Sequence, residues 1–140
     1  MDKMFVLQVD ASNTSLGFAL LQEDQGVLFP VAYGSTKLSP TQQRYSTIEK
    51  EALAIISGVR KFEPYLYGKE FVLQSDHRPL TAMNKRKYES PRIMRWALYL
   101  QRFKFLLEHI SGDENKVADY LSRSIGDGEM EDLGREKRNN

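Results

Sequence analysis

The chain has 140 residues, enough for one domain with a substantial core, and its 41% hydrophobic and 28% charged content is usual for a soluble globular protein. The absence of cysteine excludes disulfides and cysteine-ligated zinc. Its apolar runs are far shorter than a membrane span, and the first four residues (MDKM) are too short and polar to lead a signal peptide. We therefore expect a soluble domain with no membrane segment.

Charge is unevenly distributed along the chain. The formal net charge is +1, but residues 126–140 carry five acids and three bases, which leaves 17 bases and 14 acids elsewhere. This mildly basic remainder permits a nucleic-acid partner without requiring one. No periodic apolar face is present from residue 125 onward, so residues 125–140 are predicted to be a disordered tail and residues 1–124 a single domain.

The first part of the chain is predicted to form three strands. Residues 4–12 (MFVLQVDAS) form an apolar run that ends in an acid, which is typical of a buried central strand carrying a carboxylate, Asp10, to the edge of a sheet. Short polar turns separate this run from residues 15–22 and 27–35, so the three strands should form an antiparallel meander. Because Pro30 cannot donate to a strand ladder, the third strand should lie at a sheet edge.

A long helix is predicted to follow these strands. Ser46 and Glu49 have the spacing of a capping box, which would begin the helix at Thr47. Apolar residues then recur at helical spacing, and Pro64 should end or kink the helix. Residues 39–42 (SPTQ) could cap an earlier turn, so the sequence leaves the start of the helical region open by several residues.

After this helix, residues 70–75 (EFVLQS) are predicted to form a strand that leads into Asp76. A strand, a helix and a second strand suggest a right-handed crossover, in which the second strand lies parallel to the first. Asp10 and Asp76 would then be presented at the same edge of the sheet.

The last elements are a helix, a strand and a short helix. Ser90 and Pro91 look like the N-cap and first position of a helix that continues to about Phe103. Residues 103–110 alternate like a strand, and a short helix beginning near residue 113 and ending at Leu121 carries Asp119. On the first of these helices the predicted inward residues are Ile93, Trp96, Ala97 and Leu100, and the predicted outward residues are Arg92, Arg95, Tyr99 and Arg102.

The long helix offers two candidate acids, Glu49 and Glu51. Both lie on the shoulders of its apolar stripe, so periodicity does not choose between them. In the capping box, Glu49 would bind the backbone amide of Ser46, which leaves Glu51 available for another role. A cluster of acids would destabilise the fold unless other groups compensated its charge.

Five stretches of the sequence match a known family, and together they cover most of residues 6–123. The SDHRPL and NKVADYLSR signatures, in this order and spacing, are the most specific. With them, the chain resembles the ribonuclease H domain of gypsy-type LTR-retrotransposon polyproteins, which follows their reverse transcriptase. The matching stretches are VDAS (9–12), PVAYGSTKLSPTQQRYSTIEKEALAI (30–55), YLYGKEFVLQSDHRPL (65–80), RWALYLQRFKFLLEHI (95–110) and DENKVADYLSR (113–123).

The resemblance implies an α/β, RNase H-like fold with a five-stranded mixed sheet in the order 3-2-1-4-5, flanked by helices. It also implies an enzyme, an endoribonuclease that hydrolyses the RNA strand of RNA/DNA hybrids and leaves 3′-hydroxyl and 5′-phosphate ends. Attack on a phosphodiester needs a deprotonated water and a stabilised leaving oxygen, and two Mg²⁺ ions can supply both. Mg²⁺ prefers carboxylate oxygens, and Mn²⁺ could replace it.

By the same resemblance, individual residues receive roles. The metal ligands and catalytic residues are expected to be Asp10, Glu51, Asp76 and Asp119. His109 matches a position where some relatives carry a histidine thought to assist product release or proton transfer. Apart from the resemblance, residue chemistry adds candidate nucleic-acid contacts. Ser12, Asn13 and Gln74 are expected to reach sugar hydroxyls in the minor groove. Arg92 and Arg95 are expected to contact phosphate, with a simply solvated helix face as the alternative.

The expected partners are an RNA/DNA hybrid and the reverse transcriptase domain of the same polyprotein. The expected location is the cytoplasm, including virus-like particles, or the nucleus. Two other readings remain open: a catalytically weak or inactive domain that acts as a tether or nucleic-acid-binding module, and a domesticated copy that serves as a protein-interaction module. Intact acids favour the enzyme over the inactive domain, but they do not discriminate against the domesticated copy.

Overall fold

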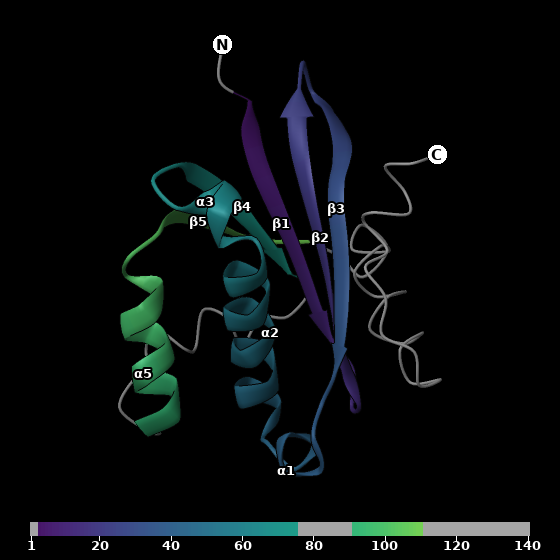
Figure 1. Ribbon diagram of the computed structural model, residues 1–140, viewed down its shortest axis with the longest axis vertical. Helices are drawn as coiled ribbons and strands as arrows, with labels where there is room; N and C mark the ends of the chain where they lie inside the picture. The colour runs from purple at the N-terminus through teal and green to yellow at the C-terminus, as the bar shows by residue number, and fades with distance from the viewer. Residues whose placement is uncertain (1–2, 76–90, 111–140) are drawn as a thin grey trace.

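The computed structural model describes residues 3–75 and 91–110 of the chain. Five strands form one sheet in the order β3-β2-β1-β4-β5, with β1 at its centre (Figure 1). β1 pairs antiparallel with β2 and parallel with β4, β2 pairs antiparallel with β3, and β4 pairs parallel with β5. The strands are β1 (Met4–Ala11), β2 (Ser15–Asp24), β3 (Val27–Lys37), β4 (Glu70–Ser75) and β5 (Lys104–His109). The predicted α/β class and strand order are confirmed.

The β2–β3 hairpin closes through a tight turn at Gln25 and Gly26. Both residues have positive φ, 54° and 81° respectively, and they connect the paired residues Asp24 and Val27. Two positive φ angles match the twist of antiparallel strands, and glycine takes such a conformation without strain. β3 lies at the edge of the sheet, as Pro30 predicted.

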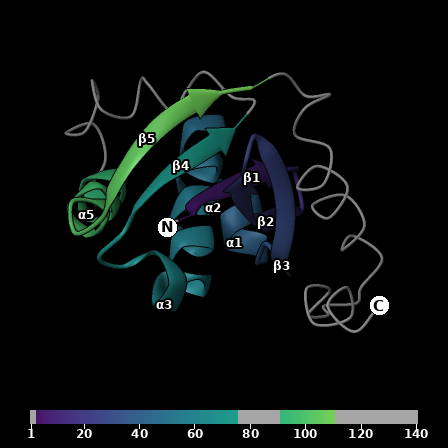
Figure 2. The same cartoon turned by 90° about the horizontal axis from the view of Figure 1, so that it is seen from above.

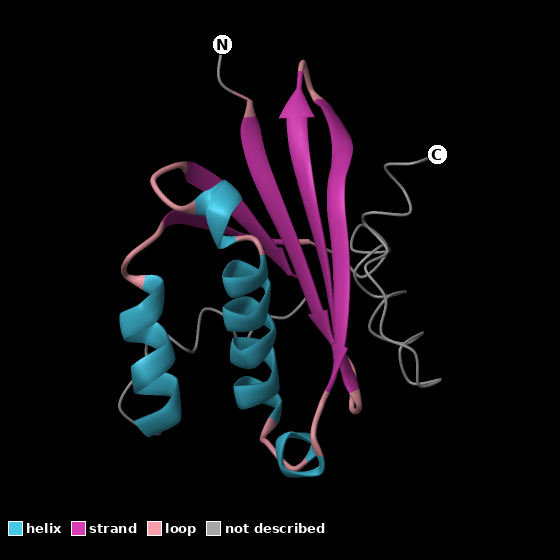
Figure 3. Cartoon of the chain, in the orientation of Figure 1, coloured by secondary structure: helices cyan, strands magenta, loops and turns pink. Residues whose placement is uncertain are grey.

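Four described helices accompany the sheet (Figure 3). They are α1 (Pro40–Gln43), α2 (Thr47–Lys61), α3 (Glu63–Leu66) and α5 (Pro91–Leu100). Ser39 closes a capping box on α1, so the earlier turn suggested by the sequence does form. α2 ends at Lys61, and Pro64 occupies the first turn of the separate helix α3, where the missing proline amide is not needed. None of the helices in this part of the chain is long and apolar enough to cross a membrane.

The main core lies between α2 and one face of the sheet. Leu7 and Val9 of β1 are fully buried, and a Cβ added to Gly58 of α2 would lie 3.1 Å from Val9 Cγ1 and 3.5 Å from Leu7 Cδ2. Ile93, Trp96 and Leu100 of α5 join the same cluster, as their helical spacing predicted. Tyr99, predicted to point outward, packs partly buried against this core. Viewed from above, the helices line one side of the twisted sheet (Figure 2).

The opposite face of the sheet carries a smaller cluster, in which Val6, Ala19, Leu21 and Tyr33 are buried. Successive residues of a strand point to opposite faces, so Val6, Gln8 and Asp10 share this face, while Leu7 and Val9 face α2. The predicted helix ending at Leu121 and the predicted tail lie outside the described residues. α5 ends at Leu100, three residues earlier than predicted, because the chain turns through a Phe103 N–H to Leu100 C=O hydrogen bond of 3.0 Å.

Candidate active site

Asp10 lies near the carboxyl end of the central strand, as the sequence predicted. Asp10 is 3% exposed, and it is paired with Gly17 of β2 in the antiparallel register. A carboxylate is rarely this deeply buried, because removing a charge from water is costly unless other groups stabilise it. The predicted role of Asp10 as a metal ligand would provide such stabilisation and stays a prediction.

Glu51 is the second deeply buried acid of the described chain. It is 2% exposed and sits in the second turn of α2, where the surrounding residues from Ala52 to Ile56 are also buried. A glutamate within an apolar helical face is a poor choice for stability alone. Its position is consistent with a functional role, which remains a prediction.

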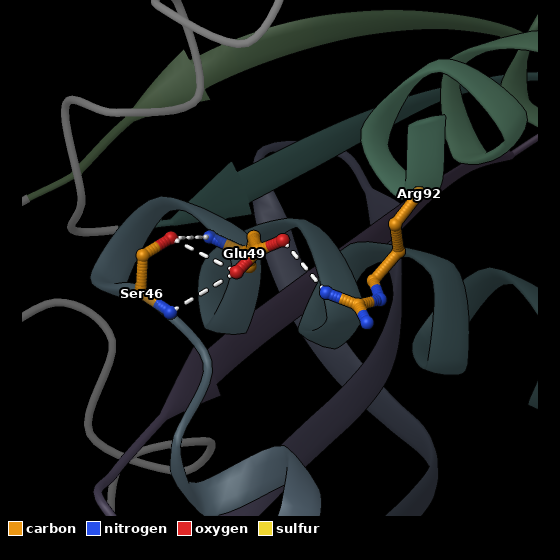
Figure 4. Close-up of polar contacts among 3 residues, drawn as sticks. All are labelled: Ser46, Glu49 and Arg92. Atoms are coloured by element: carbon orange, nitrogen blue, oxygen red, sulfur yellow. Dashed lines mark hydrogen bonds and ion pairs between the residues drawn. The ribbon is translucent and has the colours of Figure 1, made fainter. Parts of the chain in front are cut away.

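The neighbouring acid, Glu49, has a structural role (Figure 4). Its Oε1 accepts from the backbone N–H of Ser46 at 3.2 Å, and Ser46 Oγ accepts from the backbone N–H of Glu49 at 3.2 Å. This is the capping box predicted from the sequence. Its Oε2 accepts from Arg92 Nη1 of α5 at 2.8 Å. Both oxygens of Glu49 are thus used in holding the start of α2.

These contacts also set the ionisation of Glu49. Partial burial alone raises the pKa of its carboxyl group, but the Ser46 amide and the Arg92 guanidinium act in the opposite direction. Their combined effect outweighs burial and lowers the pKa of Glu49 below its ordinary value of 4.5. Glu49 is therefore a stably charged cap.

Asp10 and Glu51 lie at the same end of the sheet. The C-terminal end of β1 and the start of α2 are both on the side of the molecule that carries α1 (Figure 1). Gly58 packs over Leu7 and Val9, and Glu51 precedes Gly58 by seven residues, roughly 10 Å along the helix axis. Because α2 runs antiparallel to β1, this displacement brings Glu51 to about the level of Asp10 along the strand, one residue before β1 ends at Ala11.

The remaining two predicted acids, Asp76 and Asp119, lie outside the described residues. Within the described ranges no group of three metal-binding side chains is found. β1 and β4 are paired without a shift from Phe5 opposite Phe71 to Gln8 opposite Gln74, so these parallel strands run toward the same edge of the sheet.

A row of polar side chains crosses three strands next to this end of the sheet. Gln8 Nε2 donates to Gln74 Oε1 at 2.9 Å, and Gln74 Nε2 donates to Glu108 Oε1 at 2.5 Å. These three residues are direct neighbours in the parallel registers of β1, β4 and β5. Gln8 was not singled out from the sequence, although a glutamine that interrupts the apolar run of β1 was a usable signal. Gln74, predicted to contact nucleic acid, has its amide held at both ends.

The β1–β2 turn holds two further predicted contact residues. Ser12 Oγ accepts from the backbone N–H of Ser15 at 3.1 Å and from that of Thr14 at 3.3 Å, so it stabilises the turn. Asn13 is exposed at the same turn. Its amide is open to a ligand, and its predicted role stays a prediction.

The two predicted arginines of α5 differ in their surroundings. Arg92 pairs with Glu49, and its guanidinium carbon lies 4.1 Å from the centroid of the Tyr45 ring. Arg95 is exposed. A phosphate contact is therefore easier to form at Arg95, because Arg92 would have to leave or share its carboxylate. His109 is exposed at the end of β5 and is paired with Ser75, the residue that precedes Asp76.

Solved structures with the same architecture show the class of fold. The N-terminal RNase H domain of a Mycobacterium tuberculosis protein, solved as a fusion with maltose-binding protein, has a TM-score of 0.64 at 18% identity and covers 90% of this chain and 95% of that one. LC11-RNase H1, solved in complex with an RNA/DNA hybrid, has a TM-score of 0.60 at 13% identity. The match covers 88% of this chain and 95% of that one. A foamy viral protease-reverse transcriptase bound to double-stranded DNA has a TM-score of 0.63 at 19% identity. The match covers 78% of this chain and 20% of that one. The fold is RNase H-like.

The family follows from sequence comparison. The profile of the RNase H-like domain found in reverse transcriptase matches residues 1–103. The chain belongs to this family, and the resemblance stated from its motifs is confirmed.

Its relatives are polyproteins of retrotransposons. The retrovirus-related Pol polyprotein from transposon 297 of Drosophila melanogaster is 40% identical over 122 residues, which are 87% of this chain and 11% of the relative. The transposon Tf2-3 polyprotein of Schizosaccharomyces pombe is 37% identical over 132 residues, 91% of this chain and 10% of the relative. The chain thus spans about a tenth of the length of the relatives it matches.

Proposed function

We propose that this chain is a metal-dependent endoribonuclease that hydrolyses the RNA strand of RNA/DNA hybrids within a retroelement polyprotein. The observation that carries the proposal is the burial of two carboxylates, Asp10 and Glu51, at one end of an RNase H-like sheet. Membership of the reverse transcriptase RNase H family supports it. The reverse transcriptase domain is the proposed partner, and the cytoplasm, virus-like particles or the nucleus the proposed location.

The donor set suits a hard divalent cation. Carboxylate oxygens are the ligands that Mg²⁺ and Mn²⁺ accept most readily, and Asp10 and Glu51 are held on two rigid elements. Asp76 and Asp119 are proposed to complete the ligand set. Two Mg²⁺ ions, when bound, would lower the pKa of the attacking water and stabilise the leaving oxygen.

Residues of the chain itself would hold the metal ligands in position. Asp10 is fixed by the central strand, and Glu51 by a helix whose first turn is locked by Ser46, Glu49 and Arg92. Rigid placement matters because small displacements of catalytic groups lower the rate strongly. His109, exposed beside the end of β4, is proposed to take part in proton transfer or product release.

One assay tests the proposal. End-labelled RNA annealed to DNA is incubated with the chain in Mg²⁺, in Mn²⁺ and in EDTA, and the same RNA is tested as a single strand and as an RNA duplex. We expect metal-dependent cutting of the hybrid alone, lost in Asp10→Asn, in Asp76→Asn and in Asp119→Asn. The matched control is Glu23→Gln, an exposed acid near the far end of β2, which should cut like the parent chain.

The outcomes separate the competing readings. Binding of the hybrid without cutting in either metal would replace the enzyme by a nucleic-acid-binding tether. Neither binding nor cutting, in a protein whose circular dichroism and thermal melting show a folded state, would favour an interaction module. Cutting that persists in Asp10→Asn would show that the buried acid does not serve the reaction.

A further inference from the structure

A cluster of basic and aromatic residues lies at the other end of α2, away from the candidate active site. The guanidinium carbons of Arg60 and Arg102 lie 5.1 and 5.6 Å from the centroid of the same ring, that of Tyr99. The Tyr99 hydroxyl donates to Glu63 Oε1 at 2.8 Å. The C-terminal ends of α2 and α5 both lie near α3 (Figure 1), so residues distant in sequence meet there.

An open pocket adjoins this cluster. It has a volume of about 410 Å³ and is lined by Arg60, Glu63, Pro64 and Tyr67. The Tyr67 residue is 58% exposed, and its ring lies 5.8 Å from the guanidinium carbon of Arg102. The pocket therefore combines one cationic side chain, an accessible aromatic ring, a proline and a carboxylate, and Arg102 lies beside it at the Tyr67 ring.

The two guanidinium groups keep their hydrogen-bonding capacity. Within residues 3–75 and 91–110, neither Arg60 nor Arg102 makes a side-chain hydrogen bond or an ion pair, and both are exposed. The carboxylate of Glu63, which lines the pocket, accepts from Tyr99. Two like charges near one ring repel each other, so an anion that contacts both guanidinium groups would be favoured.

We propose that this cluster is a second nucleic-acid contact, which binds a nucleotide of a single strand. The forked donors of Arg60 and Arg102 hold the phosphate, and the base stacks on Tyr67. Planar guanidinium groups and an exposed tyrosine are the side chains from which single-strand binding sites are built. No metal and no hydrolysis enter this inference, so it stands apart from the nuclease proposal.

The position of the cluster suits a strand that extends past the catalytic end. Arg60 follows Glu51 by nine residues on α2, which is roughly 14 Å along the helix axis. A nucleic acid engaged at the acids would need to continue for only a few nucleotides to reach the cluster. The contact would hold an unpaired flank of the substrate.

The test measures binding in EDTA, where no cutting occurs. Fluorescein-labelled dT6 and rU6 are titrated with the 140-residue chain by fluorescence anisotropy at several salt concentrations. In Arg60→Gln/Arg102→Gln we expect at least tenfold weaker binding, with a salt slope shallower by roughly 1.4 for two lost phosphate contacts to a single strand. Tyr67→Leu should weaken oligonucleotide binding about tenfold with an unchanged salt slope.

Matched variants and a competing anion complete the design. Lys3→Gln/Lys37→Gln removes two exposed charges from other elements and should bind like the parent chain. Arg60→Lys/Arg102→Lys keeps both charges and should lose part of the affinity, because an ammonium group cannot form the planar fork. Thermal melting of each variant shows that it is folded.

Three results would overturn the inference. Equal weakening in the Lys3/Lys37 control would show that only net charge matters. Competition by inorganic tripolyphosphate as strong as by dT6, with no effect of Tyr67→Leu, would show a simple anion site. Unchanged oligonucleotide binding in the folded Arg60/Arg102 double variant would show that this pocket does not bind a nucleotide. A preference for an acidic peptide over dT6 would show the same.

Discussion

Glu49 Oε2 of α2 and Arg92 Nη1 of α5 lie 2.8 Å apart, and this ion pair joins the two helices two residues before the buried Glu51. The Arg92 guanidinium also covers the Tyr45 ring, and the Tyr45 and Trp96 rings lie 6.3 Å apart. The pair therefore links the start of α2 to the core face of α5. It gives the helix that carries Glu51 a defined position.

Removing this link should cost stability. We expect Arg92→Ala to lower the free energy of unfolding by about 1 kcal/mol, since the pair is partly exposed but also stacks on an aromatic ring. Urea unfolding of Arg92→Ala, Glu49→Gln and the double variant gives the coupling of the two side chains. Glutamine keeps the capping box, so Glu49→Gln isolates the charge. Fully additive losses would mean that the pair contributes nothing.

Substitutions of the two acids of α2, Glu49 and Glu51, should separate a loss of activity from a loss of stability. Glu51→Gln is expected to abolish hybrid cleavage and weaken Mn²⁺ binding, because an amide is a poorer ligand for a hard cation than a carboxylate. Glu49→Ala is expected to keep most activity per folded molecule and to lose about 1–2 kcal/mol of stability, because it removes both the capping-box contact and the ion pair with Arg92. Cleavage assays, Mn²⁺ titration and urea unfolding report these quantities. The reverse pattern would assign the metal to Glu49.

The lowered pKa of Glu49 predicts how its contribution depends on pH. The ionised carboxylate is bound more strongly in the folded state, so its stabilisation is present above the ordinary pKa of 4.5. It is lost as the pH falls through the lower pKa of the folded state. The stability difference between the parent chain and Glu49→Gln, measured by urea unfolding, should therefore shrink as the pH is lowered from 6 to 3. A difference that grows over this range would contradict the assignment.

Tyr99 should titrate above the ordinary pKa of a tyrosine side chain. Burial and the hydrogen bond to Glu63 raise its pKa from 10.0 to about 12, against the opposing effect of Arg60 and Arg102. The neutral hydroxyl is favoured by folding, so its contribution is complete below pH 10 and is lost as the pH rises through about 12. Ultraviolet difference spectra of the parent chain and Tyr99→Phe isolate this residue. A titration of Tyr99 near pH 10 in folded protein would contradict the prediction.

Gly58 should be required where α2 crosses β1. A Cβ there would lie 3.1 Å from both Phe18 Cδ1 and Val9 Cγ1, inside a closely packed core. Gly58→Ala gains about 1 kcal/mol of helix propensity but loses more by overpacking, so we expect a net loss of about 1 kcal/mol. Ser57→Ala, on the same turn, is the control and should not destabilise. A more stable Gly58→Ala would show that the sheet accommodates the added methyl group without loss of packing energy.

Much of the fold was predictable from local patterns. Alternating and continuous apolar runs indicated β1 to β5, the Ser46 and Glu49 spacing placed the start of α2, and Pro30 indicated an edge strand. The end of α5 was not predictable, because a backbone turn at Leu100 stops the helix inside an apolar sequence that would allow it to continue. α3 was missed since a proline reads equally as a stop or as the first turn of a new helix.

For the candidate site, the residue types and the family motifs predicted a metal-binding site. An acid at the end of an apolar strand, a second acid freed by a capping box and two family signatures were enough to propose Asp10, Glu51, Asp76 and Asp119 as metal ligands. Tertiary packing alone decided the surroundings, such as the burial of Glu51, the ion pair of Arg92 and the row from Gln8 to Glu108. The reason is physical: local patterns report which face of an element is apolar, whereas the partner of a charged side chain depends on which distant segments the sheet brings together.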